Sequence, residues 1–218
     1  MLWTLRILNG VAVLAALYAY FVDKSLLVPV LGFIGLLFLV SAIRKVNILG
    51  FDTLRGKFWA IFSLVGVFIF LSAFWHYGTF MNLLMHLLAR FFLATTILMM
   101  SIGLAKRGFF LRGARITWVV LAFLLILVVM VLIIPRSPVG IVWAVLFAIM
   151  DIIVFTFTIN NLLVYLGSEL GRRWTEGVLA MLTYIVSDIF FILGIMDVAY
   201  LFLIIALSLM VLNALIEE

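Results

Sequence analysis

The chain has 218 residues, of which 69% are hydrophobic and 11% are charged, and its net charge is +5. A soluble domain has about 25% charged residues, so this composition excludes a protein whose surface faces water. The chain has no cysteine, which excludes disulfides, thiolate nucleophiles and thiolate metal ligands. We therefore expect a single integral membrane domain over residues 1–218, of the all-α class.

Eight apolar stretches are candidates for membrane spans. A helix needs about 20 mostly apolar residues to cross the hydrocarbon of a bilayer. The stretches are, in chain order, 4–22, 26–43, 57–75, 79–104, 115–134, 138–166, 174–193 and 196–215. They predict a polytopic transmembrane helix bundle of eight spans. Seven spans would place Glu217 and Glu218 outside the cell and require Asp197 to lie within a helix, so we favour eight.

The basic residues between these spans predict the orientation of the bundle. Eleven of them fall on one side of an eight-span chain, namely Arg6, Arg44, Lys45, Arg55, Lys57, Lys106, Arg107, Arg112, Arg115, Arg172 and Arg173. The opposite side holds only Lys24 and Arg136. Because basic loops are retained in the cytoplasm, both termini are expected to be cytoplasmic. We expect a protein of a prokaryotic plasma membrane that contacts membrane lipids and does not bind nucleic acid.

Three ionisable residues, Arg90, Asp151 and Asp188, interrupt stretches that are otherwise apolar. A charge at the centre of a bilayer costs about 2.5–3.5 kcal/mol on insertion scales. Such residues usually face the interior of a bundle or a water-filled cavity, and they usually have partners. They are therefore the first candidates for a functional site.

Further polar side chains extend these three residues into stripes on three predicted spans. The span 79–104 carries Asn82, His86 and Arg90 at intervals of four residues, which places them on one helical face. The other two stripes are Asp151, Thr158, Asn161, Tyr165 and Glu169 on the sixth span and Glu176, Thr183, Tyr184, Ser187 and Asp188 on the seventh. We expect the three stripes to turn away from lipid and to face one another.

Helical rise places Arg90 and Asp151 near the middle of the membrane, and His86 and Asp188 nearer its outer surface. The sequence predicts an Arg90–Asp151 ion pair, with His86 and Asp188 above it in an outward-opening pocket. The pocket would also be lined by Asn82, Asn161, Tyr184 and Ser187. An alternative is that these groups only hold helices together. The two histidines have no third ligand at metal spacing, so neither a metal nor a cofactor is expected.

Several short segments resemble, in order, the motifs of the lysoplasmalogenase-like family of eight-span membrane proteins. They are Lys24 to Pro29 (family Lys-Pro-Leu-Leu-Met-Pro), Phe62 to Gly66 (Phe-Ser-x-x-Gly-Asp), Leu84 to Leu88 (Ala-His-Leu-Leu-Tyr), Pro138-Val139 with Met150, Tyr184 to Asp188 (Phe-x-x-Ser-Asp) and Asn213 to Ile216 (Gln-x-Leu-Ile). One motif departs from the family, because Gly66-Val67 replaces its Gly-Asp and thereby removes one presumed catalytic carboxylate.

The resemblance implies hydrolysis of the vinyl-ether bond of lysoplasmalogens. That reaction needs an acid to protonate the enol ether and a base to position water. By resemblance, Asp188 and His86 would be catalytic. Asp151 belongs to no family motif and is a candidate to substitute for the missing aspartate. A non-catalytic relative that retains a lipid pocket is equally compatible.

Two other classes of function remain open at this point. The protein could be a small transporter or channel, with His86, Arg90, Asp151 and Asp188 lining a proton or ion path. It could instead be a sensor or structural subunit whose helices contact a partner, or a second copy of the chain, within the membrane.

Overall fold

The computed structural model describes residues 2–106, 114–165 and 169–216, excluding the side chains of residues 114, 165 and 169–176. The described residues form eight α-helices. They are α1 (Leu2–Phe21), α2 (Leu27–Leu49), α3 (Leu54–Ser72), α4 (Phe80–Lys106), α5 (Ala114–Ile133), α6 (Ile141–Tyr165), α7 (Glu169–Ile192) and α8 (Met196–Ala214). Short 3₁₀ turns, Lys24–Leu26 and Ile134–Arg136, precede α2 and follow α5.

Each predicted span overlaps one helix of the described residues, so the all-α prediction is confirmed. The largest difference is at α2, which continues to Leu49, six residues past its predicted end at residue 43. Its last turns tolerate charge because Lys45 donates a hydrogen bond to the Ile216 carbonyl at 2.6 Å. Among the described residues, seven helices are long and apolar enough to cross a membrane. The apolar part of α7 within the described side chains, Gly177–Ile192, is shorter. The architecture is that of a multi-pass membrane protein.

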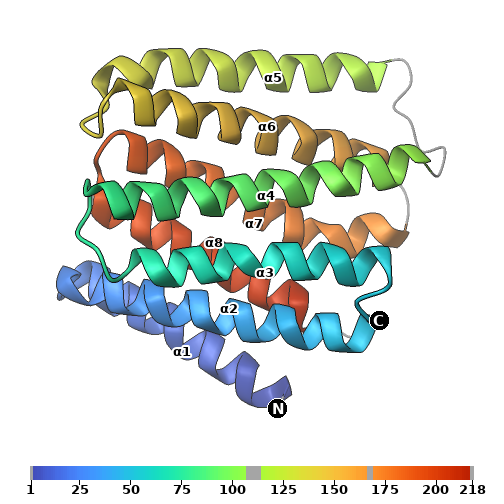
Figure 1. Ribbon diagram of the computed structural model, residues 1–218, viewed down its shortest axis with the longest axis horizontal. Helices are drawn as coiled ribbons and strands as arrows, with labels where there is room; N and C mark the ends of the chain where they lie inside the picture. The colour runs from blue at the N-terminus through green and yellow to red at the C-terminus, as the bar shows by residue number, and fades with distance from the viewer. Residues whose placement is uncertain (1, 107–113, 166–168, 217–218) are drawn as a thin grey trace.

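The helices lie side by side along one axis, with α5 at one edge of the bundle and α1 at the opposite edge (Figure 1). The start of α1 and the end of α8 lie at the same end, where Arg6 donates a hydrogen bond to the Leu215 carbonyl at 3.4 Å. We call this the terminal end, and we call the end that carries the α1–α2, α3–α4, α5–α6 and α7–α8 links the opposite end.

The basic residues within the described part follow the predicted asymmetry. Those at the terminal end are Arg6, Arg44, Lys45, Arg55, Lys57, Lys106 and Arg115. Arg107 and Arg112, and the side chains of Arg172 and Arg173, lie outside what the structure describes. At the opposite end, Lys24 forms an exposed ion pair with Asp197 at 2.5 Å.

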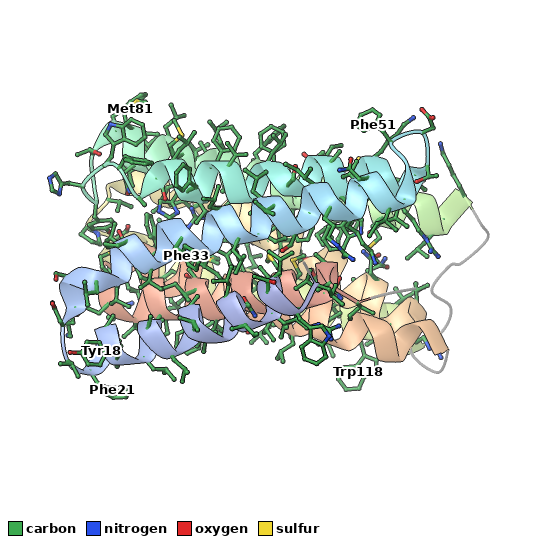
Figure 2. All side chains as sticks on the ribbon, turned by 90° about the horizontal axis from the view of Figure 1, so that it is seen from below. Tyr18, Phe21, Phe33, Phe51, Met81 and Trp118 are labelled. Atoms are coloured by element: carbon green, nitrogen blue, oxygen red, sulfur yellow. The ribbon has the colours of Figure 1, made fainter. Side chains whose placement is uncertain are left out.

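The outer surface of the bundle is apolar. Figure 2 labels six large side chains on it, Tyr18, Phe21, Phe33, Phe51, Met81 and Trp118, and each is exposed. Soluble monomers rarely expose apolar patches of more than a few hundred Å². A surface of this kind fits contact with lipid chains.

Glycines bring the backbones of α2 and α3 close together. A Cβ atom built on Gly66 would lie 2.8 Å from the Gly35 carbonyl oxygen, and one built on Gly35 would lie 3.0 Å from the Phe70 nitrogen. Only residues without a side chain permit this backbone contact. In this protein, therefore, the Gly66 of the family-like motif packs α3 against α2.

Candidate functional site

The three predicted polar stripes meet where α6 packs against both α4 and α7. We call this region the seam. Arg90 extends from α4 and contacts a carboxylate on each of the other two helices. Its Nη2 lies 2.6 Å from Asp188 Oδ1, and its Nε lies 3.7 Å from Asp151 Oδ1. Arg90, Asp151 and Asp188 are called the charged cluster from here on.

The stripes meet as predicted and the Arg90–Asp151 ion pair is present, but Arg90 also forms a second ion pair, with Asp188, that was not predicted. Asp188, expected above the ion pair, is the closer partner of Arg90, and Asp151 is the more distant one. The physical reason is the tilt of helical side chains toward the N-terminus of their own helix. Arg90 therefore reaches toward the start of α4, at the opposite end, which is the depth of Asp188 near the end of α7.

The charged cluster is enclosed, unlike the outward-opening pocket expected from the sequence. The side chains of Arg90, Asp151 and Asp188 are 0%, 1% and 2% exposed. Only the Arg90–Asp188 contact meets hydrogen-bond geometry. Both oxygens of Asp151, Oδ2 of Asp188, and Nε and Nη1 of Arg90 find no hydrogen-bond partner among the described residues. With all three groups ionised, the cluster carries one net negative charge and spare hydrogen-bonding capacity.

Two phenylalanines that the sequence reading missed complete the site around Arg90. The guanidinium carbon lies 4.1 Å from the ring centre of Phe147 and 5.1 Å from that of Phe191. At these distances the ring faces attract a cation, by about 2 kcal/mol or more where the cation is desolvated. Phe147 precedes Asp151 by four residues and Phe191 follows Asp188 by three, so helical spacing was the available signal.

His86 lies one turn from Arg90 on α4 and is buried against the same aromatic group. Its ring centre is 4.4 Å from that of Phe191. Neither ring nitrogen has a hydrogen-bond partner within the described part of the chain. His86 therefore lies next to the charged cluster and contacts Phe191, one of the two rings that cover Arg90. This position is compatible with the site role predicted for it.

Aromatic side chains close the seam on the side of the opposite end. The Tyr77 ring lies 5.3 Å from that of Phe191, and its hydroxyl donates a hydrogen bond to the Phe191 carbonyl at 3.2 Å. Trp143 packs 6.0 Å from Phe147, which in turn lies 5.7 Å from Phe191. Burial raises the pKa of Tyr77, so its hydroxyl stays a neutral donor at physiological pH. We call Tyr77, Trp143, Phe147 and Phe191 the aromatic cap.

The remaining predicted pocket residues take separate places. Asn82 donates hydrogen bonds to the Ser72 and Trp75 carbonyls at the end of α3, at 3.1 and 3.3 Å. Ser187 donates to the Ala199 carbonyl of α8 at 2.7 Å. These two residues join neighbouring helices and are not directed at the cluster.

Tyr184 and Asn161 belong to the seam. Tyr184 is fully buried on α7, four residues from Asp188. Asn161 accepts a hydrogen bond from Ser101 of α4 at 2.7 Å, nearer the terminal end. Glu169 begins α7 and does not extend the α6 stripe as predicted. The side chains of Tyr165, Glu169 and Glu176 lie outside those described.

Within residues 2–106, 114–165 and 169–216, no group of three or more His, Cys, Asp or Glu side chains is placed to hold a metal ion. The chain matches no protein-family model, no curated protein and no solved structure in the three comparisons made. The resemblance to the lysoplasmalogenase-like family therefore remains a prediction that depends on the short motifs alone.

Proposed function

We propose that the protein transfers protons within the membrane, as a small transporter or channel, and that the charged cluster is its proton-binding centre. One observation carries the proposal: a single buried guanidinium contacts two buried carboxylates. One proton on Asp151 or Asp188 turns the cluster from one net negative charge to neutral. Proton relays in membrane proteins commonly use such intramembrane carboxylates and histidines.

The proposal includes eight spans with both termini in the cytoplasm, as the basic residues of the terminal end favour. The aromatic cap would then face the outer side of the membrane and the terminal end the cytoplasm. His86, next to the cluster on the side of the cap, would be the next group to exchange a proton.

The test is proton flux into liposomes that hold the purified protein and a pH-sensitive dye, driven by a potassium diffusion potential. We expect flux from the wild type and a severalfold decrease in Asp151→Asn and in Asp188→Asn. Asp197→Asn is the matched control, because it makes the same chemical change at an exposed carboxylate of the opposite end. Flux that is unchanged in the Asp151→Asn/Asp188→Asn double variant would contradict proton transfer and leave the cluster as a tie between helices.

Lipid handling is the second candidate, and one observation favours it. The structure brings Asp151 to the same guanidinium as Asp188, which supports Asp151 as the substitute for the missing family aspartate. Two neighbouring carboxyl groups can act as acid and base in vinyl-ether hydrolysis. Incubation of the detergent-solubilised protein with a single-chain vinyl-ether lipid tests this. Aldehyde release that Asp188→Asn abolishes would favour the hydrolase, and absence of both release and lipid binding would count against lipid handling.

A further inference from the structure

Arg90 cannot compensate both of the carboxylates that it contacts. Asp151 and Asp188 carry two negative charges when both are ionised, and the guanidinium supplies one positive charge. The three side chains are 0%, 1% and 2% exposed, so bulk water does not screen the difference. A buried carboxylate without a partner is so costly in free energy that it normally takes up a proton instead. One of the two carboxyl groups is therefore the natural place for a proton, and their contacts show which one.

The two carboxylates approach Arg90 at the same edge of its planar guanidinium. Asp188 Oδ1 lies 2.6 Å from Nη2 and Asp151 Oδ1 lies 3.7 Å from Nε, and these two nitrogens form one edge of the group. Such an edge commonly binds a single carboxylate through two parallel hydrogen bonds. Here two like-charged groups share it, and two carboxylates at one site disfavour the ionisation of one of them.

The hydrogen bonds at this edge distinguish the two carboxyl groups. Asp188 accepts a hydrogen bond from Arg90 Nη2, and a bond of this kind stabilises the ionised form of the acceptor. Neither oxygen of Asp151 accepts a hydrogen bond from any described residue. Protonation of Asp151 therefore sacrifices no hydrogen bond, whereas protonation of Asp188 would weaken its bond to Arg90.

Few other charged or titratable side chains come near Asp151. Those that the flanking helices bring to this level of the seam are Arg90 and His86 of α4 and Asp188 and Tyr184 of α7. The charged side chains described for α5 and the turn after it, Arg115 and Arg136, lie at the two ends of the bundle, where each donates a hydrogen bond to a backbone carbonyl. Among the described residues at this level, Arg90 alone carries a permanent positive charge, and its hydrogen bond goes to Asp188.

We propose that Asp151 is the residue that binds and releases the proton, and that Asp188 stays ionised as the fixed counter-ion of Arg90. A proton that arrives at Asp151 forms one O–H bond and removes one negative charge, so the charged cluster becomes neutral. When that bond breaks, the proton leaves and the carboxylate returns, and no other reactant is consumed. The assignment of the proton depends on the contacts above, whereas its part in transport rests on the proposed function.

Carbon-13 NMR of the protein in lipid bilayers, with the label at the carboxyl carbon of its aspartates, tests the assignment. The chemical shift of this carbon differs between a neutral acid and a carboxylate. At neutral pH we expect a neutral-acid signal that Asp151→Asn removes while the other signals stay unchanged. Asp197, which is exposed and paired with Lys24, is the matched control and should be a carboxylate throughout. A neutral-acid signal that survives Asp151→Asn, or carboxylate signals from both Asp151 and Asp188, would overturn the assignment.

The variant Asp188→Asn gives a second and sharper expectation. Asp151 then becomes the only counter-ion of Arg90, so its signal should move from the neutral-acid position to the carboxylate position. A signal of Asp151 that stays at the neutral-acid position in this variant would overturn the division of roles, because Asp188 would then not be what leaves Asp151 without a counter-ion.

Proton flux into liposomes separates this assignment from the proposed function. A wild type with a neutral-acid signal at Asp151 but no flux would contradict proton transfer and leave the assignment standing. Flux from a wild type in which Asp151 is a carboxylate at neutral pH would overturn the assignment and leave the proposed function standing.

Discussion

Two interfaces of this bundle hold helices together by different means. Between α2 and α3, Gly35 and Gly66 bring the backbones into direct contact. In the seam, α4 and α7 make few close backbone approaches among the described residues, and Arg90 spans the distance between them. The first interface depends on glycines, whereas the second contains the charged cluster and several buried polar atoms without hydrogen-bond partners among the described residues.

The α2–α3 interface shows that two helices of this bundle can pack closely without a charged pair between them. Helices associate in lipid through close packing of small residues and modest hydrogen bonds. The α2–α3 interface achieves this with glycines, so the seam could have been built in the same way. Replacing a buried ion pair by apolar residues is often neutral or stabilising. The charged cluster is therefore better explained by chemistry than by stability.

The largest expected effect is that of removing the cation alone. Arg90→Leu leaves two carboxylates buried without a positive charge, and we expect it to lower the free energy of unfolding by about 3–5 kcal/mol. Arg136→Leu, which removes an exposed arginine at the opposite end, should change it little. Unfolding by denaturing detergent in mixed micelles measures both.

The triple variant Arg90→Met/Asp151→Leu/Asp188→Leu completes this experiment. If the cluster is retained for chemistry, the triple variant should be at least as stable as the wild type and should show no flux. A triple variant that is several kcal/mol less stable than the wild type would instead mean that the seam depends on its charges to fold.

The glycine interface should be broken by a single methyl group. In Gly66→Ala the new Cβ would meet the Gly35 carbonyl oxygen at 2.8 Å, so the two backbones must separate. Overpacking of this kind lowers stability by about 1–3 kcal/mol. Gly10→Ala is the control, since nothing lies within 4 Å of its Cβ position, and alanine favours a helix. The two substitutions should therefore shift the unfolding midpoint in opposite directions, and equal shifts would contradict the close contact.

The helices and the meeting of the three polar stripes could be predicted from the sequence because both signals are strong. Apolar stretches of span length are distinctive, and Arg90, Asp151 and Asp188 are rare charges within them. The identity of the closest pair could not be predicted from depth alone, because it depends on the reach and tilt of the Arg90 side chain. Phe147 and Phe191 were missed because the chain has 21 phenylalanines, so no single one is informative.

A small pocket lined by residues of α4, α6 and α7, Thr158 and Asn161 among them, could not be predicted for a different reason. These two residues were recognised as polar residues of one face, but the pocket depends on how three helices pack at that level. A side-chain pattern specifies which face is buried and does not specify the gaps left between buried faces.

The two carboxylates should couple unequally to Arg90. Double-mutant cycles of Arg90→Gln with Asp188→Asn and with Asp151→Asn measure each interaction, and contacts of this kind give coupling energies of about 0.5–3 kcal/mol. We expect the larger value for Asp188, at 2.6 Å, and the smaller for Asp151, at 3.7 Å. Additive effects in both cycles would exclude ion pairing, and a larger value for Asp151 would make the pair predicted from the sequence the stronger of the two.

The smallest effect is expected at a polar contact outside the seam, between α1 and α8. Asn9 of α1 donates a hydrogen bond to Ser208 Oγ of α8 at 2.9 Å. Interhelical hydrogen bonds in membrane proteins contribute about 0.6 kcal/mol on average, so Ser208→Ala should lower stability by about that amount and leave proton flux unchanged. Thr95→Val, which removes a hydroxyl bonded within its own helix, is the control. If Ser208→Ala lowered the free energy of unfolding as much as Arg90→Leu, polar contacts would be as important outside the seam as within it. The contrast between the seam and the rest of the bundle would then fail.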